Sequence, residues 1–462
     1  MIFRQLIHED LGCASYLVGD EHAGVAAVVD PKLDVADYLR LARSLGVSIT
    51  DIVETHNHAD HISGHGRLVA ATGARIHIHE LAEAEYDHLP FADGFELELG
   101  AVLLRAVHTP GHRPEHTSML VCDRGRSDEP WAVLTGDALF VGDTGRPDLA
   151  IDAEDGARQL FRSLHAGLHG LPDHVEVWPG HLGGSLCGGS GMDRKTSSTI
   201  GYERRWNAAF AETDEDRFVV RALAAIAAKP PRLERIVAAN RGPLSAAAPC
   251  AGPLTPGQVQ LGLDGDVLVV DVRTAEEFDD AHIPGAVSIP SLRSGFATKL
   301  SWILADGQAV ALVGRDDDDA RAAGSLAAAV GIDGLVGHLA GGMTSWYEEG
   351  RSVRNIEQVG VAELRLRRAA DTALEIVDVR DQAEWSAGHI RGSRHAPYHA
   401  LTSAPDWLAP GAHVAAICAS GGRAGVAASL LERHGAAEVL HVVGGGVGAW
   451  AALGEVLVSA QA

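Results

Sequence analysis

The chain has few cysteines, a shortage of positive charge and no long apolar run. Its five cysteines, odd in number and scattered over 462 residues, do not make the paired framework of a disulfide-stabilised protein. The formal net charge of −24 argues against nucleic acid and anionic membrane surfaces as partners, since both are bound through Lys and Arg. No apolar run reaches the roughly 18 residues of a membrane-spanning helix, so none is expected.

The N-terminal residues Met1 to Asp10 contain neither a long apolar core nor a cleavage site. A secretory signal is therefore not expected, and with the few cysteines this favours a reduced, cytoplasmic protein. Apolar residues make up 46% of the chain, enough to build true cores. The length of 462 residues predicts two or three domains.

The stretch from Thr55 to His61 places three histidines and one aspartate at the end of a predicted strand, Ile49 to Val53. Further ligand types, His112, Asp137 and His181, follow later apolar runs, and a glycine precedes each of them. Side chains at the ends of neighbouring strands can converge on one point. Imidazole and carboxylate together suit a divalent transition metal. Glycine would let the backbone turn sharply and approach the ion.

The motif His56-x-His58-x-Asp60-His61, with the later His112, Asp137 and His181, resembles the metallo-β-lactamase superfamily. The resemblance implies an α/β fold, a four-layer αββα sandwich with the metal at the sheet edges, over residues 1–240. The superfamily includes dizinc hydrolases such as glyoxalase II and iron-dependent persulfide dioxygenases, so this motif alone does not select the reaction.

Beyond the metal motif, a helix is predicted over Arg217 to Ala228, ended by Pro230-Pro231. The segment 242–256 is rich in proline and small residues and reads as an interdomain linker.

After the linker the sequence repeats with a period of about a hundred residues, the size of a small domain. Asp-Val-Arg, Glu followed by an aromatic residue, His-Ile-x-Gly and Gly-Gly-x-x-x-Trp all recur, at Asp271, Glu277, His282 and Gly341 and again at Asp378, Glu384, His389 and Gly445. Each copy alternates strands and helices, which predicts an α/β domain with a parallel sheet. These landmarks resemble those of rhodanese domains, over 255–352 and 355–460.

The two repeats differ at the position where rhodanese chemistry would occur. In the second, a buried strand ends at Cys418, and a short glycine-containing loop leads to Arg423 at the start of a helix. Backbone N–H groups in such a loop can form an anion site that stabilises a thiolate or persulfide. In the rhodanese family a six-residue loop from Cys to Arg accompanies sulfur transfer. The first repeat has Gly314 there, followed by four aspartates, which predicts a catalytically silent domain.

A metal domain joined to a persulfide-carrying domain resembles the persulfide dioxygenase–rhodanese fusion enzymes. Tethering raises the effective concentration of a labile intermediate. The resemblance implies one Fe2+ per chain, held by His56, His112 and Asp137, with positions left open for O2 and the substrate sulfur. The remaining motif residues would then orient ligands or water: His58, Asp60, His61 and His181. The alternative makes them ligands of a second ion in a two-Zn2+ centre with a bridging hydroxide.

Two further positions match the fused dioxygenases. Arg146 would bind a carboxylate of a thiol carrier such as glutathione through a bidentate pair, or else form a surface salt bridge. Cys187, on a glycine-rich loop after His181, would lie near the metal and accept or relay sulfur, or else fill space in the loop. Cys13, Cys122 and Cys250 are assigned no chemistry.

These features predict oxidation of a small-molecule persulfide of glutathione or a similar thiol by O2 to sulfite and thiol. This chemistry is typical of sulfide detoxification. Cys418 would pass sulfane sulfur to sulfite to form thiosulfate, or run the reverse reaction. A homo-oligomer is compatible with the sequence. The alternatives are a dizinc glyoxalase II-like thioester hydrolase with accessory rhodanese domains, and a non-catalytic sulfur carrier.

Overall fold

The fold is described from a computed structural model of the chain, which covers residues 1–183, 187–189, 191–226, 228–229, 231–246, 252–292 and 295–459. The chain divides into two compact units. Residues 1–248 with 329–331 form the first, and residues 249–328 with 332–462 form the second. No helix in the described ranges is both long and apolar enough to cross a membrane.

The first unit is built on two six-stranded sheets whose strands follow chain order. Both sheets mix parallel and antiparallel pairs; β3, β4 and β5 run parallel, whereas β7, β8 and β9 run antiparallel. The first sheet contains β1 (Ile2–His8), β2 (Cys13–Asp20), β3 (Val25–Val29), β4 (Ser48–Glu54), β5 (Arg75–His79) and β6 (Leu89–Phe91). The second contains β7 (Glu96–Leu99), β8 (Val102–His108), β9 (Thr117–Asp123), β10 (Ala132–Gly136), β11 (Glu176–Pro179) and β12 (Ser198–Thr199).

The alternation of side chains along the strands explains why these sheets stack. In β2, Tyr16 and Val18 face a core shared with Leu104 and Val121 of the second sheet, whereas Leu17 faces the opposite way. Both faces of the strand are buried, so the sheets need covering on their outer sides as well.

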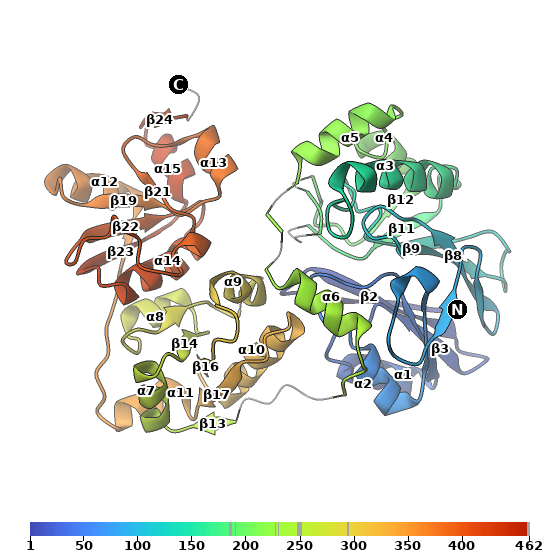
Figure 1. Cartoon of the computed structure of the whole chain (residues 1–462), viewed down its shortest axis with the longest axis horizontal. Helices are drawn as coiled ribbons and strands as arrows, with labels where there is room; N and C mark the ends of the chain where they lie inside the picture. Colours follow the sequence, from blue (N-terminus) through green and yellow to red (C-terminus); the bar gives the residue numbers. More distant parts are fainter. Residues whose placement is uncertain are drawn as a thin grey trace. The chain divides into compact units, whose positions relative to one another are not determined.

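Helices cover the outer face of each sheet, as Figure 1 shows. Tyr38 and Leu68 from α1 and α2 pack on the first sheet, and Leu160 of α3 and Phe218 of α5 pack on the second. The predicted αββα sandwich is therefore confirmed. The helices of this unit are α1 (Ala36–Leu45), α2 (His65–Thr72), α3 (Ala153–Ser163), α4 (Ile200–Trp206), α5 (Glu215–Ala224) and α6 (Leu233–Arg241).

The predicted helix over Arg217 to Ala228 is shifted in the structure. It begins earlier, because the Asp214 side chain accepts a hydrogen bond from the backbone N–H of Arg217 and so caps it. It also ends four residues sooner, at Ala224, well before the two prolines. The prolines therefore do not end the helix.

The second unit contains two five-stranded parallel sheets, one for each sequence repeat, in agreement with the prediction. Strands in the first run in the order β13 (Pro253–Leu254), β17 (Leu335–Leu339), β16 (Val310–Val313), β14 (Leu268–Asp271) and β15 (Val287–Ser288). In the second the order is β18 (Glu357–Gly360), β23 (Glu438–Val443), β22 (His413–Ile417), β19 (Glu375–Asp378) and β21 (Arg394–His395). An antiparallel pair, β20 (His389–Ile390) with β24 (Leu457–Val458), is additional to the prediction.

Helices connect the strands of both repeats. Those of the first repeat are α7 (Pro256–Asp264), α8 (Ala275–Asp280), α9 (Phe296–Ile303), α10 (Asp317–Ala329) and α11 (Gly342–Glu348). Those of the second are α12 (Val361–Ala370), α13 (Gln382–Ala387), α14 (Gly422–Arg433) and α15 (Gly446–Ala452).

The repeated sequence landmarks are structural in both copies. Asp271 pairs with Arg273, and Asp378 pairs with Arg380, each at 2.6 Å within a buried site. The aromatic residue after each of the two repeated glutamates stacks on the following histidine, Phe278 on His282 and Trp385 on His389. These landmarks therefore define the fold of each copy and do not distinguish an active domain from a silent one.

The predicted linker is shorter than expected. Leu254 of β13 pairs with Leu339, and Pro256 already begins α7 after the cap residue Thr255. Cys250 and its neighbours 247–251 lie outside the described residues.

Candidate functional site

Three side chains from different strand ends bring bare ligand atoms to one point. His56 Nε2, His112 Nε2 and Asp137 Oδ2 are buried, and none has a hydrogen-bond partner among the described residues. The aspartate oxygen lies 3.8 Å from the first nitrogen and 3.4 Å from the second. Buried polar atoms almost always have partners, so three bare atoms in one place call for an explanation. Two imidazoles and a carboxylate fit a divalent transition metal, and these residues form one of the candidate metal-holding groups.

Hydrogen bonds fix which nitrogen of each histidine is free. The Thr55 hydroxyl lies 2.8 Å from Asp30 Oδ2 and 2.9 Å from His56 Nδ1. Because the carboxylate can only accept, the hydroxyl donates to Asp30 and accepts from the ring. His112 Nδ1 donates to the Arg146 carbonyl at 3.0 Å. Both rings are thus held with the lone pair on Nε2, the arrangement of a metal ligand.

Glycine residues let the backbone pack closely around Asp137. Gly136 has a φ of +48°, and a Cβ there would lie 2.6 Å from His116 Nε2. A Cβ on Gly180 would lie 2.6 Å from Asp137 Oδ1. The positive φ of Gly136 agrees with the predicted sharp turn, and glycine at these positions also makes room for neighbouring protein groups. Gly111 even packs against the backbone of Leu160 in α3.

Protonation states at the three residues suit metal binding. Burial lowers the pKa of His56 and of His112, which keeps both imidazoles neutral. Burial opposes ionisation of Asp137, yet the charge and hydrogen bond of His181 hold the pKa of that carboxyl well below its usual range. The site therefore offers two neutral nitrogens and one carboxylate.

His58, the second histidine of the motif, does not join this group. Its Nε2 lies 3.3 Å from both Asp30 and Glu54, and these three buried residues form another candidate metal-holding group, in which His58 Nε2 has no hydrogen-bond partner among the described residues. Burial disfavours the imidazolium, but the two carboxylates outweigh it and raise the pKa of His58 to about 9. The Asp30 carboxylate therefore anchors both His58 and, through Thr55, His56.

Asp60, His61 and His181 form a second cluster together with Cys13. His181 bridges two carboxylates, with Nδ1 2.8 Å from Asp137 and Nε2 2.8 Å from Asp60. Burial opposes protonation, but these carboxylates raise the pKa of His181 well above its usual value. Both of its ring nitrogens are thus occupied as donors, in contrast to the bare nitrogens of His56 and His112.

Cys13 is a site residue that the sequence did not reveal, and His116 also contacts the metal-ligand group. Cys13, predicted to lie in an inert setting, is buried with its Sγ 3.4 Å from Asp60 and 3.5 Å from His61. His116 Nε2 accepts the backbone N–H of Asp137 at 2.8 Å. Nothing in the local pattern indicates the Cys13 contacts, because they join segments 47 and 48 residues apart along the chain.

Cys187 lies beside the metal-ligand group. Its Sγ belongs to a cluster with Asp137 and His181 whose ligand atoms are all within 4.8 Å of one another. Burial, with the nearby negative charge of Asp60, raises the pKa of Cys187 well above its usual value. The residue is therefore held as a thiol, which is a poor nucleophile and a weak acid.

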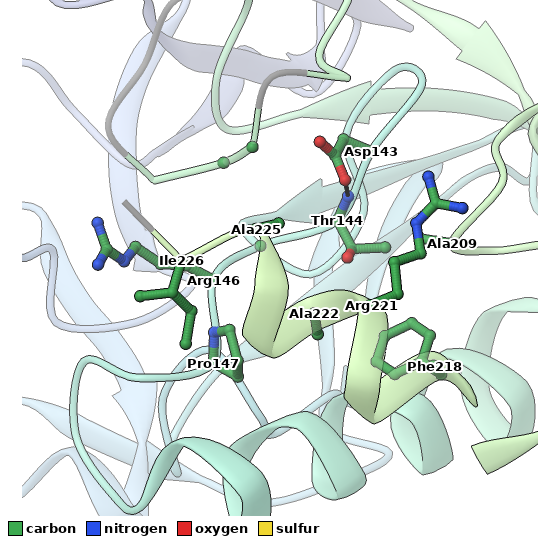
Figure 2. Close-up of a pocket in the computed structure, with 13 residues that line it drawn as sticks. Asp143, Thr144, Arg146, Pro147, Ala209, Phe218, Arg221, Ala222, Ala225 and Ile226 are labelled. Atoms are coloured by element: carbon green, nitrogen blue, oxygen red, sulfur yellow. Dashed lines mark hydrogen bonds between the residues drawn. The ribbon is translucent and has the colours of Figure 1, made fainter. Parts of the chain in front are cut away.

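A pocket opens on the loop that follows Asp137, as Figure 2 shows. The 143–147 loop forms one wall, and Phe218 and Arg221 of α5 form another. Arg146 lines this pocket, but its guanidinium makes a bidentate pair with Asp148 at 2.7 and 2.9 Å. Its backbone carbonyl meanwhile orients His112. The alternative for Arg146, a salt bridge, is present but buried, and binding of a thiol carrier by Arg146 stays a prediction.

Cys418 follows the end of β22 and is buried. The backbone N–H of Gly421, which has a φ of +105°, lies 3.1 Å from the sulfur. The Cys418 carbonyl accepts the N–H of Val447, and a Cβ on Gly446 would lie 1.8 Å from that carbonyl oxygen. The loop is therefore held from behind by α15, with a donor aimed at the sulfur.

Arg423 is paired and does not offer a free charge. Its guanidinium lies 2.9 Å from Glu384 and 3.0 Å from Asp381. Burial opposes its charge, but the bond to Glu384 raises the pKa of Arg423. In the first repeat, Gly314 follows β16 at the place of Cys418, and Arg315 pairs with Asp319 at 3.3 Å.

Family comparisons match both parts of the chain. Residues 8–181 match the metallo-β-lactamase superfamily, and residues 255–349 and 361–453 match the rhodanese-like domain.

The sequence relatives match about two fifths of the chain, whereas one solved structure covers more of it. The chain is 32% identical to the mitochondrial persulfide dioxygenase ETHE1 of Homo sapiens, over 39% of this chain and 68% of the relative. It is also 32% identical to a hydroxyacylglutathione hydrolase of Polaromonas, over 36% of this chain and 61% of the relative. A crystal structure of a metallo-β-lactamase from Staphylococcus aureus matches with a TM-score of 0.66 and 30% identity, covering 74% of this chain and 98% of that one.

Proposed function

The chain belongs to the metallo-β-lactamase superfamily and continues into two rhodanese-like domains, and we propose that it is an iron-dependent persulfide dioxygenase with a sulfurtransferase domain. The relatives of its first unit and the rhodanese-like domains together support a role in sulfur metabolism. The finer assignment depends on the bare ligand atoms of His56, His112 and Asp137.

The metal would be held by His56, His112 and Asp137 alone. The nitrogens of His181 are both bonded to carboxylates, and His58 is ion-paired with Asp30 and Glu54. A ferrous ion at this three-residue set would supply binding of dioxygen and of the substrate sulfur at open positions.

The protein's own groups then do the remaining work. The proposed reaction converts a persulfide R-S-SH, O2 and water into the thiol R-SH, sulfite and two protons. His181 carries a proton between Asp60 and Asp137, and Cys187 keeps a thiol proton close by. His181 is positioned to supply a proton to the departing thiolate.

The pocket beside the 143–147 loop is our candidate for the thiol carrier. Arg221 contributes a positive charge to its wall, and Phe218 and Ile226 contribute apolar surface. This combination suits a peptide-like thiol that bears carboxylates, such as glutathione. Arg146 lines the same pocket, and its guanidinium is held in place there by the pair with Asp148.

In the second unit, Cys418 is the proposed sulfur carrier. Its thiolate attacks the outer sulfur of thiosulfate, the S–S bond breaks, sulfite leaves and Cys418 keeps a persulfide. Sulfite or a thiol then takes that sulfur and restores the thiolate. The N–H of Gly421 stabilises the negative charge in both forms.

Oxygen consumption with glutathione persulfide tests the dioxygenase. Anaerobically purified, iron-loaded protein should consume O2 and release sulfite. His56→Ala should lose this activity, whereas Cys418→Ser should retain it. His22→Ala, at an exposed histidine outside the site, is the matched control. Absence of oxygen uptake by protein with one iron per chain would refute the dioxygenase.

A dizinc thioester hydrolase is the second candidate, favoured by the cluster of Cys13, Asp60, His61 and His181 and by the hydrolase relatives. Two zinc ions per chain and hydrolysis of lactoylglutathione would establish it. A lasting Cys418 persulfide without turnover of either substrate would instead indicate a sulfur carrier.

A further inference from the structure

One buried histidine connects the two repeats of the second unit. His441 of β23 has Nδ1 2.7 Å from Asp279 Oδ2, and that aspartate belongs to α8 of the Cys-less domain. Its Nε2 lies 2.9 Å from the carbonyl oxygen of Gly421, in the Cys418 loop. Both side chains are buried, His441 at 1% exposure and Asp279 at 4%. Asp279 of the Cys-less domain is thus linked to the Cys418 loop by two hydrogen bonds of the His441 ring.

The chemistry of the two partners fixes the charge on this ring. A carboxylate and a backbone carbonyl can only accept, so both nitrogens of His441 must donate, and the ring is an imidazolium. Burial opposes that charge, but the hydrogen bond that His441 donates to Asp279 outweighs it and raises the pKa of His441. Glu276 of α8 adds a second negative charge, while Gln358 of β18 donates to Asp279 at 2.6 Å.

The surrounding backbone is shaped for the ring. A Cβ on Gly425 of α14 would lie 3.0 Å from His441 Cε1, so glycine there admits the imidazole. Aligning the Gly-Gly landmarks puts Gly337 of the first repeat at the position of His441. The Glu-aromatic landmarks put Ser386 at the position of Asp279. The reciprocal pair, with an aspartate in the second repeat and a histidine in the first, is therefore absent at these positions.

We propose that Asp279 of the Cys-less domain is a positioning residue for the Cys418 loop, acting through a charged His441 that anchors the Gly421 carbonyl. The N–H of a trans peptide points opposite to its carbonyl, so fixing this oxygen also fixes the direction of the Gly422 N–H. The neighbouring Gly421 N–H is the one that contacts sulfur. The imidazolium adds positive charge behind a loop that must hold a thiolate or persulfide. This gives the silent domain a function, and it rests on the proposed role of Cys418.

The test compares two titrations on the same full-length variant, Asp279→Asn. One is the single-turnover rate of Cys418 persulfide formation from thiosulfate. The other is the protonation of His441, read from its 13Cε1 resonance, which the His441→Gln spectrum assigns. In Asp279→Asn, the loading rate should fall about tenfold below that of the wild type at pH values where the His441 ring is neutral. The pH midpoint of this loss should coincide with the pH midpoint of His441 protonation. His441→Gln should show the same loss at every pH.

Two control variants separate this coupling from loosening of the domain contact. Asp280→Asn removes the same charge from an exposed site on the same helix. Glu432→Gln weakens another bond between the repeats, the one at 2.8 Å to His282, without touching the loop. Both should load sulfur at the wild-type rate. Wild-type loading by Asp279→Asn with a neutral His441, loss of rate while His441 stays protonated, or an equal loss in Glu432→Gln would each overturn the proposal.

If the wild type does not take sulfur from thiosulfate, the proposed sulfurtransferase fails but the coupling can still be decided. Hydrogen exchange of the peptide containing Gly421 and Gly422 should then be faster in Asp279→Asn than in Asp280→Asn. Equal exchange in these two variants would overturn the positioning role by itself.

Discussion

At the metal centre, side chains that are not ligands decide which ligand atoms are free. The Thr55 hydroxyl accepts a hydrogen bond from His56 Nδ1 and donates one to Asp30. Without this acceptor the ring could rotate or adopt the other tautomer, and its Nε2 would no longer be held as a bare donor. The affinity for metal thus depends on a residue that does not touch it.

Thr55→Val should therefore weaken metal binding while leaving the fold intact. Valine keeps the shape but cannot accept from His56, and an affinity loss of about 10- to 100-fold is expected. Competition with a chelator, read as iron retained per chain, measures it. Thr213→Val, at an exposed threonine far along the chain, should retain wild-type affinity. Equal affinities of the two variants would show that the hydroxyl does not orient His56.

Gly136 is the residue where backbone shape and ligand placement coincide. Alanine there must adopt a φ of +48° and also meet the His116 ring, so strain of about 1 kcal/mol adds to overpacking of about 2 kcal/mol. Gly24→Ala is the matched control, because its φ is +70° but nothing lies within 4 Å of a Cβ there.

Urea unfolding should show a loss of about 3 kcal/mol for Gly136→Ala and about 1 kcal/mol for Gly24→Ala. Similar losses of unfolding free energy in both variants would mean that the His116 side chain moves aside at little cost and that only the positive φ destabilises the protein.

At the scale of elements, the two repeats share one scaffold and differ in the loop that it supports. Gly446 at the start of α15 supports the Cys418 carbonyl, and Gly342 at the start of α11 takes the matching place against the Gly314 carbonyl, where a Cβ would lie 2.6 Å away. Both have positive φ values, +51° and +60°. The first glycine of the helix thus packs against the loop carbonyl in both repeats, against Cys418 in one and Gly314 in the other.

Alanine at these two positions should separate stability from sulfur chemistry. Gly446→Ala and Gly342→Ala should both destabilise the second unit, by at least about 1 kcal/mol, because each combines strain with a clash. Only Gly446→Ala should also strongly reduce persulfide formation on Cys418, measured by mass spectrometry after exposure to thiosulfate. An equal chemical defect in Gly342→Ala would mean that the first repeat supports the loop by more than the Asp279 contact.

At the scale of the whole chain, local sequence patterns predicted the metal-ligand residues and the two repeats. They could not predict contacts between residues far apart along the chain. Strand-end ligands and the repeats are visible because each depends on a few adjacent residues. The contacts of His58 could not be predicted, since the motif spacing does not show that its ring will lie beside Asp30 and Glu54. Cys13 and the Asp279–His441 pair were hidden for the same reason: their partners are 47 and 162 residues away along the chain.

Each unit has its own hydrophobic core, so the whole chain should unfold in two transitions. Only the first unit contains the His56, His112 and Asp137 site. Anaerobic Fe2+ at about a hundred times its dissociation constant should stabilise that unit by about 2.7 kcal/mol and raise its Tm by roughly 5–10 °C.

Differential scanning calorimetry with and without Fe2+ measures both transitions, and the second should not move. His56→Ala should abolish the shift of the first transition while His22→Ala preserves it. A shift of both transitions together, or a shift that survives in His56→Ala, would mean that the ion acts elsewhere, because stabilisation by a ligand is confined to the cooperative unit that binds it.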